Sequence, residues 1–360
     1  MKYSHPQRKT DKNLPEVRVL LVGFGFMGKM HAAVYHQLAG VTLAGIVDPQ
    51  VDAAQAHLKS MRISCPVFSR LSEAEGILMD AVDICLPTDL HPTAVAWAAR
   101  FRKPIFCEKP IALDFRAARA MLRQVERAKV FFQVGHCIRF WPEYQALESF
   151  VRSKRGGKML SLSLQRRAAR PQYSHQDWLN GGGRSGGAAL DLHIHDTDFV
   201  HHLLGRPHAV HSLGTQDRSG WSHIFTHYEY PTVRVTAEGG WNYPPKWGFQ
   251  MAFQAVFEKA TMEYDSNSKP TLSVVLGSGK RKPWPFQAPN TGKARGAGGN
   301  LSSLGGYTNE LMAFLQCLRS RRKPQIATGE QAADSLRTVL AEIASARTGK
   351  VVRLKSGGTR

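Results

Sequence analysis

A glycine-rich turn near the N-terminus restricts the possible folds of this chain more than any other feature. The apolar run Val17 to Val22 leads directly into Gly23-Phe24-Gly25-Phe26-Met27-Gly28, where a helical pattern begins, and the next apolar run ends at Asp48. A G-x-G-x-x-G segment between a strand and a helix, with an acidic residue closing the next strand, predicts a parallel α/β domain that binds a dinucleotide. The alternative is a tight turn into a helix that binds no ligand.

The three glycines have different tasks in such a turn. Gly23 permits the tight turn, Gly25 lets the backbone approach a pyrophosphate, and Gly28 lets the helix pack closely on the sheet. The pyrophosphate is expected beside Phe26 and Met27, where free N–H groups and the dipole of the new helix converge.

Asp48 is the predicted contact to the adenosine ribose of the cofactor. Its carboxylate accepts hydrogen bonds from hydroxyl groups, and its negative charge repels a 2′-phosphate. We therefore expect NAD as the cofactor, with NADP as the less favoured form.

The rest of the first 140 residues continues the alternation of strands and helices. Apolar runs lie at Val17 to Val22, Val41 to Val47, Val82 to Leu86, Pro104 to Cys107 and Val130 to Val134, separated by helical patterns at Met27 to Leu38, Gln50 to Lys59, Pro92 to Phe101 and Phe115 to Ala128. Strands that alternate with helices of this length predict a doubly wound parallel sheet.

After about residue 145 the patterns predict an α+β domain with an open, mostly antiparallel sheet. Strand patterns occur at Met159 to Leu164, Phe225 to Tyr230, Thr232 to Glu238, Phe249 to Phe257 and Ala260 to Tyr264, and amphipathic helices at Tyr307 to Arg319 and Gly329 to Ala346. The expected organisation is a disordered basic arm over residues 1–16, a nucleotide-binding domain over 17–138, an α+β domain over 139–354 and a basic tail over 355–360.

The composition excludes several classes of protein. Hydrophobic residues make up 42% of the chain, which is enough to bury a core and excludes a wholly disordered protein. The five cysteines are widely spaced without a C-x-x-C motif, which argues against a disulfide framework and a cysteine-type zinc site. No apolar stretch is long enough to span a membrane, and the N-terminus lacks the apolar segment of a secretory signal. A cytoplasmic protein is therefore expected.

The charge raises the question of a polyanionic partner. Lys and Arg number 48 against 28 Asp and Glu, which gives a net charge of +20. The basic runs at Lys280 to Lys282 and Arg319 to Lys323 lie at turns and helix ends, without the interleaved aromatic residues of a groove for single strands. Because no nucleic-acid-binding motif is visible, we expect no specific nucleic-acid partner.

A series of motifs in a fixed order resembles one known family. The motifs are GFGFMGKMHAAVY, LPTDLHPTAVAWAA, CEKPIAL, VGHCIRFWPEY, GGAALDLHIHDTDFVHHLLG and YTNELMAFLQCL. Over roughly residues 17–354 the chain resembles the glucose–fructose oxidoreductase / inositol dehydrogenase / MocA (Gfo/Idh/MocA) family of NAD(P)-dependent oxidoreductases. The resemblance implies an N-terminal Rossmann domain and a C-terminal α+β domain that covers the nicotinamide.

The resemblance also assigns roles to residues, position by position. It implies cofactor contacts from Gly23, Gly25, Phe26, Met27, Gly28, Asp48, Pro87, Thr88, His91, Glu108 and Lys109. Pro110 is commonly a cis-proline in the family. Lys109, Asp191 and His195 match the family's catalytic Lys…Asp-x-x-x-His set. The alternatives are an exposed lysine beside a turn and polar residues on the surface of a helix.

Departures from the family pattern concern the substrate pocket. His193 occupies a position where many members have a small residue, and Gly135-His136-Cys137 precedes Ile138-Arg139 where many have an Asn or a second Arg. The predicted substrate contacts are Arg139, Arg166, Trp178 and His193. For Arg166 and Trp178, which lie among Arg167, Arg170 and Arg184, the alternative is a solvated basic loop.

The predicted catalytic residues suit the oxidation of a hydroxyl group. The cofactor carries the hydride, so the protein must accept a proton and stabilise developing charge on oxygen. His195 is the expected proton acceptor, because the ordinary pKa of histidine lies near neutrality. Lys109 is expected to stabilise alkoxide character, and Asp191 to orient either group. Residues four apart on a helix share one face, so Asp191 and His195 are expected to project together.

A different interpretation of the segment Leu190 to His195 leads to metal chemistry. As a strand, this segment would place Asp191, His193 and His195 on one face and form a metal site. The helical spacing that continues to Leu204, followed by Gly205 as a C-cap, favours a helix and no metal.

The sequence thus predicts an NAD-dependent enzyme that reversibly transfers a hydride to or from a hydroxyl-bearing carbon of a sugar, cyclitol or related polyol. Two alternatives remain: a non-catalytic NAD-binding regulator and an NAD-dependent glycoside-cleaving enzyme. The resemblance further suggests a homodimer or homotetramer assembled through the outer face of the open sheet.

Overall fold

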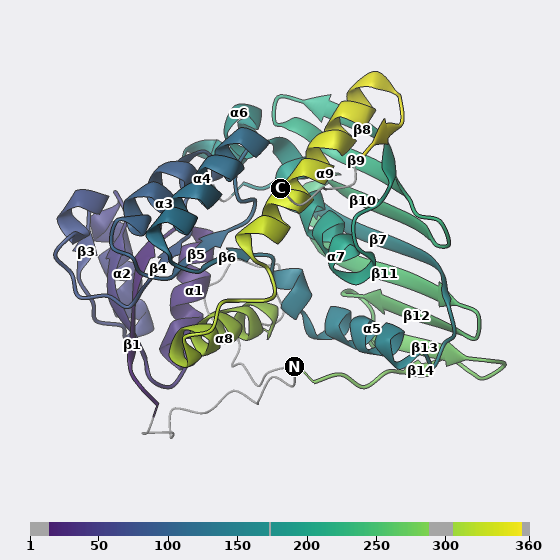
Figure 1. Cartoon of the computed structure of the whole chain (residues 1–360), viewed down its shortest axis with the longest axis horizontal. Coiled ribbons are helices and arrows are strands. Elements are labelled where there is room, and N and C mark those ends of the chain that lie inside the picture. The colour runs from purple at the N-terminus through teal and green to yellow at the C-terminus, as the bar shows by residue number, and fades with distance from the viewer. Residues whose placement is uncertain (1–13, 173, 288–304, 355–360) are drawn as a thin grey trace. The chain divides into compact units, whose positions relative to one another are not determined.

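The computed structural model describes residues 14–172, 174–287 and 305–354, and these residues form two compact units (Figure 1). The first unit comprises residues 14–137 and 305–333, and the second comprises 138–287 and 334–354. Most of the predicted basic arm (residues 1–13) and the predicted basic tail lie outside the described residues. Among the described residues, no helix combines the length and the apolar character that crossing a membrane requires.

The first unit is built on a six-stranded parallel sheet. Its strands are β1 (Val17–Val22), β2 (Val41–Val47), β3 (Val67–Phe68), β4 (Ala81–Ile84), β5 (Ile105–Glu108) and β6 (Phe132–Gly135). They pair in the order β3-β2-β1-β4-β5-β6, and each of these pairs is parallel. The predicted doubly wound sheet is therefore confirmed. The strand order reverses at β1, and ligands of such sheets bind at this switch point, at the carboxyl ends of the strands.

The helices that pack on this sheet are α1 (Phe26–Gln37), α2 (Val51–Met61), α3 (His91–Ala99), α4 (Phe115–Ala128) and α8 (Gly305–Ser320). Helix α4 shows why these segments form helices. Asp114 caps its N-terminus by accepting a hydrogen bond from the Ala117 N–H, and Met121 and Val125 lie on its buried face.

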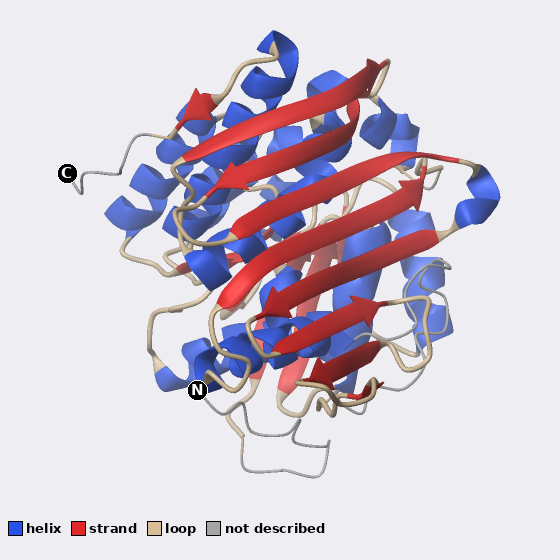
Figure 2. Ribbon diagram, turned by 90° about the vertical axis from the view of Figure 1, so that its right-hand side faces the viewer, coloured by secondary structure: helices blue, strands red, loops and turns tan. Residues whose placement is uncertain are grey.

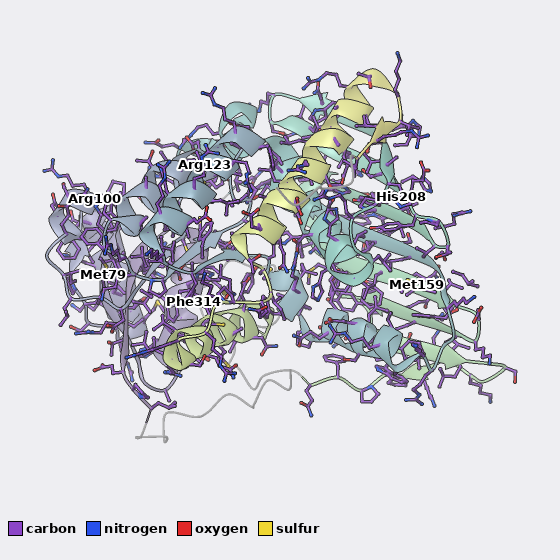
Figure 3. All side chains as sticks on the ribbon, viewed as in Figure 1. Met79, Arg100, Arg123, Met159, His208 and Phe314 are labelled. Carbon is purple, nitrogen blue, oxygen red and sulfur yellow. The ribbon has the colours of Figure 1, made fainter. Side chains whose placement is uncertain are left out.

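Helix α8 is far from the other elements of the first unit in sequence but belongs to its core. Leu311 and Phe314 pack in one apolar cluster with Val19, Tyr35 and Phe106, which come from β1, α1 and β5. Phe314 is labelled in Figure 3. This helix therefore closes one face of the parallel sheet, next to α1.

The second unit is built on a nine-stranded sheet, which Figure 2 views nearly face on. Its strands are β7 (Met159–Ala169), β8 (Ala209–Asp217), β9 (Gly220–Glu229), β10 (Arg234–Tyr243), β11 (Phe249–Phe257), β12 (Ala260–Asp265), β13 (Leu272–Leu276), β14 (Lys282–Pro283) and β15 (Val352–Arg353). The order is β14-β13-β12-β11-β7-β10-β9-β8-β15, with β7 and β10 parallel and the other pairs antiparallel. The predicted open, mostly antiparallel sheet is confirmed.

Helices cover one face of this sheet. They are α5 (Pro142–Ser153), α7 (Ile194–Leu204) and the part of α9 (Gly329–Thr348) that follows residue 333. On β7, Leu162 and Leu164 face the helices and are buried, whereas Ser163 between them lies on the outer face. Tyr144 of α5 packs its ring against that of Phe253 on the sheet, with the ring centres 5.2 Å apart.

The segment before Gly205 is helical throughout. A π-helical turn, η5 (Ala189–His193), leads into α7, which ends at Leu204 with Gly205 at a φ of 78°. The strand interpretation of Leu190 to His195 is therefore wrong. In a helix, Asp191, His193 and His195 do not share the single face that a metal site on a strand would need.

Candidate functional site

The glycine-rich turn leaves room for a ligand at only one of its three glycines. A Cβ on Gly23 would lie 2.6 Å from the carbonyl oxygen of Cys85, and a Cβ on Gly28 would lie 2.1 Å from that of Gly23. A Cβ on Gly25 would meet nothing within 4 Å. Helix α1 begins directly after Gly25, and no side chain caps it. The turn therefore presents open backbone at the start of a helix, which fits a bound pyrophosphate.

Asp48 is tied to this turn. Its Oδ2 accepts a hydrogen bond of 2.7 Å from the Phe24 N–H, and its Oδ1 accepts one of 2.9 Å from the Gln50 N–H. An ionised carboxylate has about four acceptor positions, so Asp48 retains capacity for hydroxyl donors. The structure thus brings Asp48 and the turn together, as the predicted ribose contact requires.

The turn after β4 carries Pro87, Thr88 and His91, which were predicted to lie near the cofactor. Thr88 and His91 are buried, and Pro87 is partly exposed. The ring of His91 lies between the carbonyl oxygens of Leu86 and Pro110, each 2.9 Å from a ring nitrogen. Burial lowers the pKa of His91. His91 therefore connects two turns at the carboxyl edge of the sheet.

The segment Glu108-Lys109-Pro110 follows β5 at the same edge. The Lys109–Pro110 peptide is cis, and Lys109 is partly exposed. Glu108 is only 5% exposed, and its Oε2 accepts a hydrogen bond of 3.1 Å from the Lys109 N–H. The carboxyl ends of β1, β4 and β5 thus place the glycine-rich turn, the His91 turn and Lys109 at one edge of the first unit.

A buried polar cluster lies behind this edge, and the sequence interpretation did not identify it. It consists of His31 and Tyr35 from α1, Asp83 from β4, Cys85 directly after β4, and Glu108. One side-chain atom each of His31, Asp83 and Cys85 lies within 4.8 Å of the other two. The signal was present in the sequence, because Asp83 interrupts an apolar strand.

In the second unit, Asp191 and His195 lie on consecutive helical turns. Asp191 belongs to η5 and is partly exposed, and His195 lies at the start of α7 with 9% of its surface exposed. Gly186 and Gly187, both with a positive φ, turn the chain into this segment. A π-helical turn is a frequent device at functional sites, because it changes the direction of side chains within a helix.

His193 lies inside the second unit. It is fully buried, and its Nε2 lies 2.6 Å from Oε2 of Glu342 on α9. The same carboxylate accepts hydrogen bonds from the hydroxyls of Thr197 (2.9 Å) and Thr226 (3.0 Å). A Cβ on Gly239 of β10 would lie 2.6 Å from that of His193, so the sheet approaches this ring closely. The histidine thus joins η5 to both α9 and the sheet.

The remaining predicted substrate contacts have different surroundings. The guanidinium groups of Arg139 and Arg166 are buried, and each makes two hydrogen bonds of 2.7–2.9 Å to one carboxylate, that of Asp198 and Asp196 respectively. Trp178 lies in a short 3-10 segment and is partly exposed. Both arginines therefore engage carboxylates of α7 within the second unit.

Comparison with family models identifies both units. A model described as an oxidoreductase family with an NAD-binding Rossmann fold matches residues 17–136. A model described as the GFO/IDH/MocA C-terminal domain matches residues 144–263.

Curated relatives match about half of the chain. The inositol 2-dehydrogenase of Rhizobium meliloti (strain 1021) is 35% identical over 189 residues, which cover 52% of this chain and 55% of that protein. The 2,7-anhydro-N-acetylneuraminate hydratase of Escherichia coli (strain K12) is 30% identical over 196 residues, which cover 54% of this chain and 51% of that protein. The chain thus spans about half the length of the curated relatives that it matches.

Solved structures share the fold over nearly the whole chain. A levoglucosan dehydrogenase in complex with NADH and levoglucosan superposes with a TM-score of 0.78 at 19% identity, covering 95% of this chain and 100% of that chain. A myo-inositol dehydrogenase from Corynebacterium glutamicum ATCC 13032 gives a TM-score of 0.76 at 22% identity, covering 95% and 100%. At this identity the likeness establishes the fold.

Proposed function

The chain belongs to the Gfo/Idh/MocA family of NAD-binding oxidoreductases, and from this premise we propose that it reversibly transfers a hydride between NAD and a hydroxyl-bearing carbon. The substrate class that we propose is a sugar, a cyclitol or a related polyol. The family relatives named as inositol dehydrogenases, and the structural neighbour crystallised with levoglucosan, support this class.

One observation carries the proposal. The open backbone at Gly25 and the turn that bears Lys109 lie at the same carboxyl edge of the parallel sheet, where doubly wound sheets bind their ligands. The open backbone at Gly25, directly before helix α1, fits a pyrophosphate, and Asp48 fits a ribose with free hydroxyls. The residues present therefore suit NAD.

Each proposed catalytic group has one task. NAD, when bound, accepts or returns the hydride. Lys109 donates a hydrogen bond to the substrate oxygen and stabilises negative charge on it. His195 takes up the hydroxyl proton, and Asp191 orients these groups.

The substrate contacts are proposed in two groups. Trp178, which is partly exposed, is proposed to contact the substrate directly. Arg139, Arg166 and His193 are proposed to act through α7 and η5, because their polar atoms pair with buried carboxylates.

The oligomeric state and the cellular location of the protein are also proposals. Leu213 and Phe225 are 60% and 50% exposed on the outer face of the nine-stranded sheet, beside a hollow of about 320 Å³ lined also by His211 and His227. We propose that a second copy of the chain covers this face in a homodimer or homotetramer. None of the five cysteines, all of which the structure describes, forms a disulfide, and this supports a cytoplasmic protein.

The function is tested with the parent protein, Lys109→Ala and the control Lys59→Ala, which changes an exposed lysine of α2. NAD binding is measured by fluorescence titration, and turnover with a panel of sugars, inositols and polyols. Lys109→Ala is expected to lower kcat by about 10²–10⁴-fold, a much larger effect than any change in Kd for NAD.

Three results would overturn this assignment. Parent-like turnover by Lys109→Ala would show that Lys109 takes no part in the reaction. NAD binding without turnover on any member of the panel favours a regulator. Retained cofactor with release of an aglycone favours glycoside cleavage.

A further inference from the structure

The buried cluster behind Lys109 connects the cofactor-binding helix α1 with the turn that carries Lys109. On one side of the ring, Nδ1 of His31 lies 2.8 Å from Oδ2 of Asp83, which also accepts a hydrogen bond of 2.9 Å from the Tyr35 hydroxyl. On the other side, Nε2 of His31 lies 3.2 Å from Oε1 of Glu108. His31 and Asp83 are fully buried.

The positions of these atoms determine where protons are needed. Nδ1 of His31 lies within hydrogen-bond distance of the Asp83 carboxylate. Nε2 lies 3.2 Å from Oε1 of Glu108, but the ring N–H direction does not point at this oxygen, and both atoms are buried without a hydrogen-bond partner. A neutral imidazole carries one N–H, so it would present a lone pair to one of the two carboxylates. Two buried acceptors facing each other without a proton are costly. A doubly protonated ring donates a hydrogen bond to Asp83 and places a positive charge 3.2 Å from the buried Glu108 oxygen that lacks a hydrogen-bond partner.

Glu108 transmits this arrangement to the backbone of Lys109. Its Oε1 faces His31, and its Oε2 accepts the hydrogen bond from the Lys109 N–H. A Cβ on Gly135 would lie 2.9 Å from this carboxyl group, so the neighbouring strand β6 leaves it little freedom. The orientation of the Glu108 carboxylate is thus set by His31 on one side and by Gly135 on another.

We propose that His31 is a positioning residue of the hydride-transfer site, which as a buried cation between Asp83 and Glu108 holds the Glu108 carboxylate on the backbone of Lys109. This inference rests on the proposed function of Lys109. It assigns α1 a second task, because the helix that begins at the phosphate cradle also fixes the turn of the catalytic lysine.

The other groups that face the cluster are compatible with a charged ring. Burial lowers the pKa of His31, but the Asp83 carboxylate 2.8 Å from Nδ1 outweighs burial, and the pKa of His31 lies well above its ordinary value. Burial raises the pKa of Cys85 and of Tyr35, so both remain protonated. From α8, the ring of Tyr307 lies 6.5 Å from that of His31, and Glu310 adds a negative charge that acts on Tyr35.

The protonation of His31 can be measured on the cofactor-free protein. Proton–nitrogen correlation spectra of protein labelled with nitrogen-15 in its histidines distinguish a doubly protonated ring from a neutral one. The His31 signal is identified by its loss in His31→Gln, or by its shift in Tyr35→Phe if the first variant does not fold. We expect both ring nitrogens to stay protonated at about pH 8.5, where an ordinary histidine is neutral. A neutral ring at that pH overturns the proposal.

The consequence for turnover is tested with a matched pair of variants on one helix. His31→Gln changes the buried ring, and His36→Gln changes an exposed histidine of α1. For His31→Gln we expect kcat to fall by at least about tenfold, a barrier increase of about 1.4 kcal/mol. KM for the substrate and Kd for NAD are expected to stay within about twofold. His36→Gln is expected to behave as the parent.

The pH profile separates positioning from a purely structural role. In the parent, kcat is expected to fall at alkaline pH as His31 loses its proton, because the charge beside Glu108 is then lost, and His31→Gln is expected to lack this limb of the kcat profile. An unchanged kcat and profile in His31→Gln, with an active parent, overturns the positioning role and leaves the proposed function intact. If the parent protein turns over no substrate while its His31 ring is doubly protonated, the proposed function is contradicted, and the charge on His31 is not.

Discussion

At the scale of single residues, the three glycines of the nucleotide turn differ in the space around them. A side chain at Gly23 would overlap the backbone of Cys85, directly after β4, and a side chain at Gly28 would overlap the backbone of Gly23, whereas the space beside Gly25 is open. The sequence assigned these different tasks from the motif, and the contacts around Gly23 and Gly28 give the physical reason for two of them. The open space that can accept a pyrophosphate is the space that a side chain at position 25 would occupy.

A pair of substitutions separates the two kinds of glycine. Gly28→Ala is expected to lower the free energy of unfolding by about 1–3 kcal/mol, because its methyl group overlaps the Gly23 carbonyl. Gly25→Ala is expected to leave the melting temperature near that of the parent and to weaken NAD binding at least about tenfold, since the methyl group occupies the cradle. Thermal denaturation and NAD titration check both. Parent-like NAD affinity in Gly25→Ala would place the phosphate elsewhere.

The His31 cluster predicts how stability depends on pH. The folded protein raises the pKa of His31, so it binds this proton more tightly than the unfolded chain does. The resulting stabilisation is fully present below about pH 6.5 and is lost as pH rises through the folded value. In His31→Gln the loss of unfolding free energy should be largest below about pH 6. It should shrink at higher pH by up to about 1.4 kcal/mol per unit.

Denaturant titrations of the parent, His31→Gln and His36→Gln across this pH range measure that difference. A loss in His31→Gln that does not change with pH would mean that the ring contributes packing and no charge.

At the scale of elements, local patterns predicted helix α8 but not its place in the core of the first unit, and they did not predict the π-helical turn η5. The spacing of Asp191 and His195 predicted a regular helix, and the structure has a π-helical turn that continues into one. The turn packs on β9 and β10, and the His193–Glu342 pair anchors it from α9. Strand β8 was missed, because Gly214 and exposed polar residues interrupt its apolar alternation.

The His193–Glu342 pair, which joins η5 to α9, can be tested by mutation. Glu342→Gln is expected to lower the free energy of unfolding by about 1.5–3 kcal/mol, because a neutral amide replaces a buried carboxylate that three groups contact. It is also expected to lower kcat, since η5 carries Asp191. Glu229→Gln changes an exposed carboxylate of β9 and serves as the control. Equal stability of the two variants, measured by denaturant unfolding, would show that the pair does not hold η5.

At the scale of the whole molecule, the outer face of the nine-stranded sheet is the most informative surface. Leu213 of β8 pairs with Phe225 of β9, so two largely exposed apolar side chains lie next to each other on this face. The sequence suggested assembly through this face by family resemblance. The structure adds the particular residues that a partner copy would bury.

Assembly is tested by sedimentation of the parent, Phe225→Lys and Leu78→Lys. Phe225→Lys places a charge on the proposed interface and is expected to shift the mass to that of the monomer. Leu78→Lys changes a residue of the first unit that is 68% exposed and is expected to sediment as the parent. A monomeric parent, or a Phe225→Lys variant of parental mass, would contradict the proposed interface.

Local sequence determined the strands of the first unit except β3, its helices, its parallel sheet and its nucleotide turn. It could do so because hydrophobic periodicity and the backbone freedom of glycine act over a few neighbouring residues. Only the tertiary structure placed α8 in the core of the first unit, set His31 between Asp83 and Glu108, and paired Arg139 and Arg166 with buried carboxylates. These features depend on contacts between residues far apart in the chain, and a buried charge finds its partner only when packing excludes water from both.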